Sequence, residues 1–263
     1  MNMGIIGYGN LAKALGKGLR RDEHIQLWVS APSLTPGTPE PRLHTHTDNL
    51  AMISQIDCLI LAVKPAQMAD LLTEIRDHMP PGLLVISVAA GLTVDWFATH
   101  LLPNIPLIRA MPNLASECGQ GATPLFANPF VNATQREQAT RAFSACGLTT
   151  WVTQETEIDA LIALSGSGLA YLFLFTEAMR HAGVKLGLSE EVATAFAVQT
   201  LQGAAGLAAL PHYSLTSLQT QVTSKAGTTA AALAVFANHR LNDIVLTAMT
   251  AAFERSSSLS KES

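Results

Sequence analysis

The chain has 263 residues, of which 48% are hydrophobic and only 14% are charged, and its formal net charge at pH 7 is −4. This length suggests two domains with a sizeable buried core. The negative net charge and the lack of a basic run argue against nucleic acid as a partner.

The first half of the chain alternates between short apolar runs and segments with helical spacing. Continuous apolar runs of this length are typical of parallel strands that are buried on both faces. The expected strands are Met3–Ile6, Ile25–Ser30, Cys58–Val63, Leu83–Val88, Pro106–Ala110 and Leu148–Thr153, and the expected helices are Asn10–Arg20, Ala66–His78, Val94–Leu101 and Thr134–Gly147.

From Glu155 onward the pattern predicts helices only. The expected fold is therefore an α/β Rossmann-type domain with a mostly parallel sheet over residues 1–153, followed by an all-α dimerisation domain over residues 154–255. The polar segment "SSSLSKES" at residues 256–263 predicts a disordered tail.

The helices of the second half carry few charges, which raises the question of a membrane. Their longest uncharged stretches are interrupted by Gly, Gln, Thr and Ser, unlike the continuous apolar span of about 20 residues that crosses a bilayer. We therefore expect no membrane contact, and a homodimer or a higher oligomer of dimers. Cys58, Cys118 and Cys146 form no CxxC pair and the first residues lack a signal-peptide pattern, which indicates a cytoplasmic protein.

The segment "GIIGYGNLAKA" contains Gly7-x-Gly9-x-x-Ala12 between an expected strand and an expected helix. Gly7 suits the tight turn, and Gly9 lets a pyrophosphate approach the backbone N–H groups at the start of the helix. The motif predicts a dinucleotide site. The next strand ends in "WVSAPSLTPG", with Ser30 and Ser33 but without the acidic residue that usually binds the ribose of NAD, which favours NADP while NAD stays possible.

Six segments occur in the order found in pyrroline-5-carboxylate reductases. They are "LAVKPAQM", "SVAAGLT", "RAMPN", "LSGSGLAY", "AGVKLGL" and "VTSKAGTTAAAL". The chain resembles that family from about Gly4 to Phe253. The resemblance implies an oxidoreductase that transfers hydride from NAD(P)H to the C=N carbon of 1-pyrroline-5-carboxylate and produces L-proline, the last step of proline biosynthesis.

The resemblance also implies which residues bind the cofactor. The "AVKP" turn should lie beside it, while Asn49 and the Val88–Ala90 turn should line the adenosine and nicotinamide regions. With the glycine motif and the end of the second strand, the expected cofactor residues are Ile6, Gly7, Tyr8, Gly9, Asn10, Leu11, Ser30, Ser33, Asn49, Ala62, Val63, Lys64, Pro65, Val88, Ala89 and Ala90.

The loop "SKAGTT" leads into an expected helix, whose first N–H groups lack helical partners and suit the carboxylate of an imino acid. The expected substrate residues are Ser224, Ala226, Gly227, Thr228 and Thr229. The resemblance places Thr229 near the ring nitrogen, as a catalytic proton donor or as a group that positions substrate; a plain helix N-cap is the alternative. Lys225 and Ala226 replace the family's usual Pro-Gly, and Leu169 replaces a usual Pro.

Two other functions stay open from the sequence. A β-hydroxyacid dehydrogenase shares the two-domain plan but needs a lysine acid inside a C-terminal helix, and neither Lys185 nor Lys225 sits in such a place. A nucleotide-binding protein without catalysis is the second alternative. We expect no metal site.

Overall fold

The structure is a computed structural model that describes residues 1–262, with the backbone alone for residues 260–262. Its contacts divide the chain into two compact units. The first, here called the sheet unit, contains Met1–Gly166 and the chain from Ala252 onward; the second, the helical unit, is Ser167–Ala251.

In the described part of the sheet unit, nine strands form one sheet in the order β3-β4-β2-β1-β5-β6-β7-β8-β9. Neighbours pair in parallel except β3 with β4 and β7 with β8, which confirms the expected mostly parallel sheet. The strands are β1 (Asn2–Ile6), β2 (Gln26–Ser30), β3 (Gly37–Glu40), β4 (Leu43–His46), β5 (Cys58–Leu61), β6 (Leu84–Ser87), β7 (Leu107–Ala110), β8 (Gly121–Ala127) and β9 (Gly147–Trp151).

Three of these strands, β3, β4 and β8, were not expected from the sequence. All four residues of β3 are exposed and include Pro39, so this edge strand lacks the apolar run that marks a buried strand. In β4, buried Leu43 and Thr45 alternate with two half-exposed histidines, a pattern too short and too polar to stand out.

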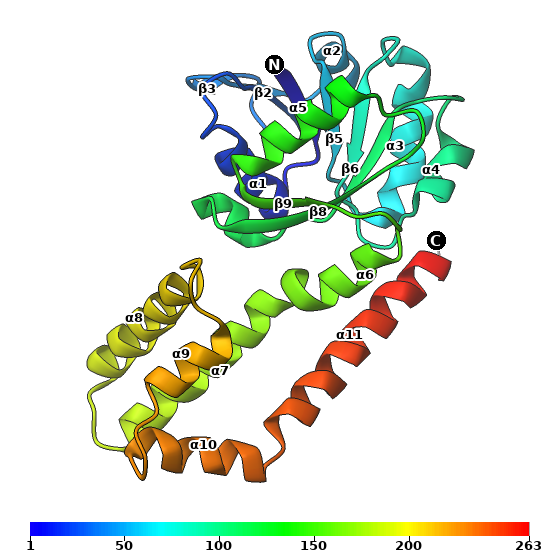
Figure 1. Ribbon diagram of the computed structural model, residues 1–263. Coiled ribbons are helices and arrows are strands. Elements are labelled where there is room, and N and C mark those ends of the chain that lie inside the picture. Colours follow the sequence, from blue (N-terminus) through cyan, green and yellow to red (C-terminus); the bar gives the residue numbers. More distant parts are fainter. Residues whose placement is uncertain (263) are drawn as a thin grey trace. The chain divides into compact units, whose positions relative to one another are not determined.

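Helices cover both faces of the sheet, with α1 and α5 on one face and α3 and α4 on the other (Figure 1). The helical segments of this unit are α1 (Asn10–Leu19), α2 (Asn49–Ile53), η1 (Pro65–Gln67), α3 (Met68–Ile75), η2 (Arg76–His78), α4 (Val94–His100), η3 (Leu114–Cys118), α5 (Ala133–Ser144), α6 (Glu157–Leu161) and the π-helical turn η4 (Ile162–Gly166).

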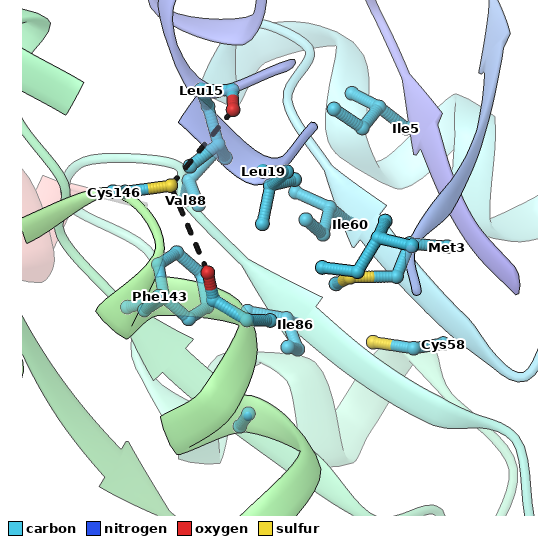
Figure 2. Packing of buried hydrophobic residues seen from close by; sticks show 14 of the residues in the cluster. Met3, Ile5, Leu15, Leu19, Cys58, Ile60, Ile86, Val88, Phe143 and Cys146 are labelled. Carbon is cyan, nitrogen blue, oxygen red and sulfur yellow. Dashed lines mark hydrogen bonds between the residues drawn. The ribbon is translucent and has the colours of Figure 1, made fainter. Parts of the chain in front are cut away.

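Successive residues of a central strand point to opposite faces, so both neighbours in the sequence must be apolar. In β5, Cys58 and Ile60 join the core beneath α1 and α5, whereas Leu59 and Leu61 join the core beneath α2, α3 and α4. Figure 2 shows Cys58, Ile60 and Met3 in the first of these cores. This double burial explains why the central strands are continuous apolar runs.

The three cysteines are free. Cys146 is fully buried, and its thiol donates weakly to the carbonyls of Leu15 at 3.9 Å and Ala142 at 3.8 Å (Figure 2). Burial raises the pKa of the Cys146 thiol to about 12 and raises that of Cys58 still further, so both stay protonated as packing groups.

The helical unit consists of α7 (Gly168–Lys185), α8 (Glu190–Ala208), α9 (Leu215–Gln221), α10 (Thr228–Asn238) and the first part of α11 (Leu241–Glu262). Large apolar side chains on these helices are exposed, including Phe173 at 62%, Leu174 at 73% and Phe196 at 69%. The stretch Glu157–Lys185 is long and apolar enough, by length and composition alone, to cross a membrane, and 17% of its most apolar window is buried.

The end of the chain differs from the sequence prediction. The expected disordered tail from residue 256 is wrong as far as Glu262, because α11 continues through that residue. Ser256 is only 6% exposed and donates to Asp159 Oδ1 at 2.8 Å. A run of serines suggests solvent, yet one of these hydroxyls has a buried carboxylate as its partner.

Candidate active site

The first glycine of the motif makes the turn at the end of β1. Gly7 has φ +90°, and a Cβ at this position would lie 2.8 Å from the carbonyl oxygen of Ala62. Its N–H donates to the carbonyl of Ser30 at 2.9 Å. Gly7 is therefore required, because the backbone turns between two neighbouring strand ends where a side chain has neither space nor a favourable φ.

The second glycine opens the start of α1. Gly9 is the N-cap residue; no side chain caps the helix there, and the first turn carries no acidic residue. No atom lies within 4 Å of the position that a Cβ on Gly9 would occupy. The free N–H groups and the positive end of the helix dipole thus face open space, which fits a phosphate group.

A cleft of about 590 Å³ lies at the carboxyl ends of β1, β2 and β5, in front of this turn. Ligands of open α/β sheets bind at this edge. The expected cofactor residues that line the cleft are Ile6, Gly7, Tyr8, Gly9, Ser30, Ser33, Asn49, Ala62, Val63 and Lys64. Partial burial is the main cause that raises the pKa of the Tyr8 phenol, which stays neutral here.

The remaining expected cofactor residues do not line this cleft. Asn10 and Leu11 belong to the first turn of α1, and Pro65 begins η1. Val88, Ala89 and Ala90 follow β6, the next strand beyond β5, where Val88 N–H donates to the carbonyl of Leu61 at 3.1 Å. The turn after β6 therefore continues the same edge of the sheet.

The end of β2 presents a buried hydroxyl. Ser30 is completely buried, and within the part of the chain that the structure describes its Oγ has no hydrogen-bond partner. An unsatisfied buried hydroxyl is unfavourable, and a ligand oxygen nearby would satisfy it. Arg42, the next arginine after this strand in the sequence, donates instead to the carbonyls of Arg20 and Asp22. The residues thus fit a dinucleotide, with hydroxyls rather than a guanidinium at the second strand.

Three polar residues of the cleft were missed by sequence reasoning. Gln67, Asp70 and Glu74 line it from η1 and α3. Glu74 Oε1 accepts a hydrogen bond from Asn49 Nδ2 at 3.1 Å. The sequence did contain a signal for them, because all three lie in the helical segment that follows Lys64, and this segment starts at the edge of the sheet where the cofactor is expected.

The proposed substrate loop lies in the helical unit. Gly227 is the N-cap of α10, and no side chain caps this helix, so the hydroxyls of Thr228 and Thr229 are not used as caps. Gly227 N–H donates to the carbonyl of Ser224 at 3.1 Å, which closes the loop. The first turn of α10 contains no acidic residue, and its free N–H groups can donate hydrogen bonds to a carboxylate.

Ala226, at the tip of this loop, has φ +57°. This left-handed conformation is unfavourable for a residue with a Cβ and is the reason that glycine is common in such turns. The replacement of the family's usual glycine by Ala226 therefore leaves the loop in its turn conformation with local backbone strain.

Together, a mostly parallel sheet with a glycine turn, an uncapped helix start and a helical second unit define a dinucleotide-dependent oxidoreductase of the Rossmann type. The family model "Pyrroline-5-carboxylate reductase dimerisation" matches residues 155–259, and the model "NADP oxidoreductase coenzyme F420-dependent" matches residues 2–91.

Whole-chain comparisons identify the family. Pyrroline-5-carboxylate reductase from Pseudomonas aeruginosa is 36% identical over 262 residues, covering 98% of this chain and 96% of that protein. The same enzyme from Escherichia coli is 33% identical, with 98% of each chain covered. A structure of the reductase from Coxiella burnetii superposes with a TM-score of 0.89 at 35% identity and 98% coverage of both chains. The chain therefore belongs to the pyrroline-5-carboxylate reductase family.

A second solved structure bears on the cofactor. The Plasmodium falciparum pyrroline carboxylate reductase with NADP bound superposes with a TM-score of 0.89 at 27% identity, covering 99% of this chain and 98% of that one. These findings confirm the resemblance and the fold class, and they favour the reductase over the β-hydroxyacid dehydrogenase alternative.

Proposed function

We propose that this protein reduces 1-pyrroline-5-carboxylate to L-proline with NADPH. Its membership of the reductase family over nearly the whole chain carries this proposal. The open space at Gly9 and the buried, unpartnered hydroxyl of Ser30 support a bound dinucleotide. When bound, the reduced nicotinamide supplies the hydride that adds to the C=N carbon of the imino acid.

The residues of the sheet unit hold and orient this cofactor. The turn from Ile6 to Leu11 binds the pyrophosphate through backbone N–H groups. Ser30, Ser33 and Asn49 bind the adenosine end. The Ala62–Pro65 and Val88–Ala90 turns would hold the nicotinamide end.

The loop from Ser224 to Thr229 binds the substrate. Its free N–H groups and the positive end of the α10 dipole hold the carboxylate. The ammonium of Lys225, which is exposed in the structure, adds positive charge beside it. Thr229, half-buried in the first turn of α10, places its hydroxyl at the ring nitrogen, where it donates to a neutral imine or accepts the N–H of an iminium.

Two roles remain for the Thr229 hydroxyl. It orients the imino acid, or it also passes a proton to the nitrogen as the amine forms. A threonine hydroxyl has too high a pKa to be an efficient acid alone, and a substrate that is already protonated as an iminium needs none. We favour orientation.

The exposed apolar faces of the helical unit support a homodimer, as does the match to a dimerisation model. In this dimer the substrate loop of one protomer lies over the nicotinamide held by its partner. Association of dimers into a larger oligomer, a cytoplasmic location and a lack of membrane or nucleic-acid partners belong to the same proposal.

The direct test mixes the purified protein with 1-pyrroline-5-carboxylate and either NADPH or NADH. Loss of reduced-nicotinamide absorbance, with proline as the product, is expected, and it should be faster with NADPH. No turnover with either cofactor would overturn the proposed activity.

A further inference from the structure

A buried ionic cluster connects three elements of the sheet unit. Arg109 on β7 is 2% exposed; its Nη1 lies 3.0 Å from Glu155 Oε1, and its Nη2 lies 3.5 Å from Asp159 Oδ1 on α6. Ser256 near the end of α11 donates to the same Asp159 oxygen. The last turns of the chain are thus hydrogen-bonded to a buried carboxylate of the sheet unit.

The same cluster reaches the turn that follows β6. Glu155 Oε1 also accepts the N–H of Val94 at 2.9 Å, so it caps the start of α4. Thr93, the N-cap of α4, accepts the N–H of Trp96 with its side chain at 3.1 Å. Only Gly91 and Leu92 separate this N-cap from the Val88–Ala90 turn.

The end of α11 also packs against Gly91, the residue that directly follows this turn. Gly91 has φ +80°, and a Cβ built on it would lie 3.0 Å from Leu259 Cβ and 3.2 Å from the Leu259 backbone. Gly91 and the helix end are therefore in close contact, and neither can move toward the other. Ser256 and Leu259 hold one helix end against both the buried cluster and Gly91.

We propose that the carboxyl-terminal end of α11, through Ser256 and Leu259, is a positioning element for the nicotinamide. It fixes the Val88–Ala90 turn from behind, so that the nicotinamide end of the cofactor meets a preformed surface. This inference rests on the proposed function, because the assignment of that turn to the nicotinamide does. The adenosine end, held by Ser30, Ser33 and Asn49 at another part of the sheet edge, does not depend on α11.

The experiment compares two ligands on the same variants without substrate. NADPH reports on the whole site, and 2′,5′-ADP reports on the adenosine end alone. The variants are Ser256→Ala, which removes the hydrogen bond to Asp159, and a chain that ends after Ser258, which removes Leu259. Ser257→Ala is the matched control, because the side chain of this neighbouring serine makes none of the hydrogen bonds found for residues 1–259. Dimer formation and thermal unfolding are measured alongside.

For Ser256→Ala we expect NADPH binding to weaken about fivefold, near the lower end of coupling energies between connected sites, with a larger loss in the shortened chain. Binding of 2′,5′-ADP should be unchanged in both, and Ser257→Ala should resemble the wild type. An equal weakening of both ligands would overturn the proposal and reduce the helix end to a stabilising role, as would unchanged NADPH binding. If the shortened chain does not fold, Ser256→Ala decides. Failure of the wild type to reduce 1-pyrroline-5-carboxylate would refute the proposed function, and the ligand comparison would still report on the turn.

Discussion

The two units of this molecule use apolar residues in opposite ways. In the sheet unit, β5 and β6 bury all of their side chains between two layers of helices. In the helical unit, α7 and α10 contain no buried residue, although both are strongly apolar. The first unit thus completes its own core, whereas the second requires an additional surface to cover it. Apolar residues therefore form a buried core in the sheet unit and an exposed association surface in the helical unit.

The largest expected effect tests whether that interface assembles the active site. Gly9→Trp should block the cofactor turn, and Thr229→Trp should block the substrate loop, so each homodimer should be inactive. In a dimer with shared sites, equal mixing should restore roughly a quarter of wild-type activity, because about half of the dimers are mixed and each has one intact site. Steady-state turnover after subunit exchange measures this recovery.

The controls for the mixing experiment are the two variants measured alone and an independent demonstration that subunits exchange. If exchange occurs and activity stays at zero, each site is built within one chain. The helical unit would then need its partner to cover its apolar faces, but not to complete the active site.

The next effect concerns the hydroxyl of Thr229 in the helical unit. Thr229→Val keeps the volume and the branching of the side chain but removes the O–H. If the hydroxyl passes a proton in the transition state, kcat should fall about a hundredfold; if it only orients substrate, KM should rise instead. Full kinetics against 1-pyrroline-5-carboxylate separates the two, with Thr228→Val as the neighbouring control. Unchanged constants would leave Thr229 without either role.

A smaller effect is expected in the sheet unit, where the adenosine end of the cofactor is proposed to bind. Ser30→Asp should weaken NADPH binding about tenfold through charge repulsion with the 2′-phosphate, while NADH binding changes little. Glu74→Gln should instead strengthen NADPH binding, because it removes the charge of a carboxylate that lies 3.1 Å from Asn49 Nδ2. Equal responses of NADPH and NADH would show that neither position distinguishes the cofactors.

The smallest expected effect is on stability. Ala226→Gly should raise the free energy of unfolding by about 1 kcal/mol or less. The substitution relieves the strain of φ +57°, but the greater freedom of glycine in the unfolded chain offsets part of this gain. Denaturant unfolding at fixed protein concentration measures it, since dimerisation also stabilises. Ala231→Gly, inside α10, is the contrasting control and should destabilise.

The sequence predicted the parts of the fold in which local pattern and burial agree. Apolar runs such as Cys58–Val63 indicated central parallel strands, and Gly7 and Gly9 indicated the turn, because each needs a backbone without a side chain. Strand β3 escaped prediction because its four exposed residues carry no apolar signal. The structured end of α11 escaped prediction because Ser256 is buried against Asp159, a partner that is distant in the sequence.

The candidate site divides in the same way. Residues at strand ends, such as Ser30 and Lys64, were predictable because parallel strands bring their carboxyl ends to one edge. Asp70 and Glu74 were not, since their distance from the glycine turn depends on how α3 packs. The assignment of Thr229 and of the Val88–Ala90 turn came from family resemblance and remains a prediction.

The outermost strand β3 has a further consequence for assembly. An open sheet edge offers unpaired backbone groups on which another chain can add as a strand. Here Pro39 has no N–H to donate to an added strand, and the carboxylate of Glu40 is already engaged by Arg20 Nη2 at 2.6 Å. Copies of this protein are thereby discouraged from joining sheet to sheet at β3. Self-association is directed to the apolar helices, where it produces a closed pair rather than a growing fibre.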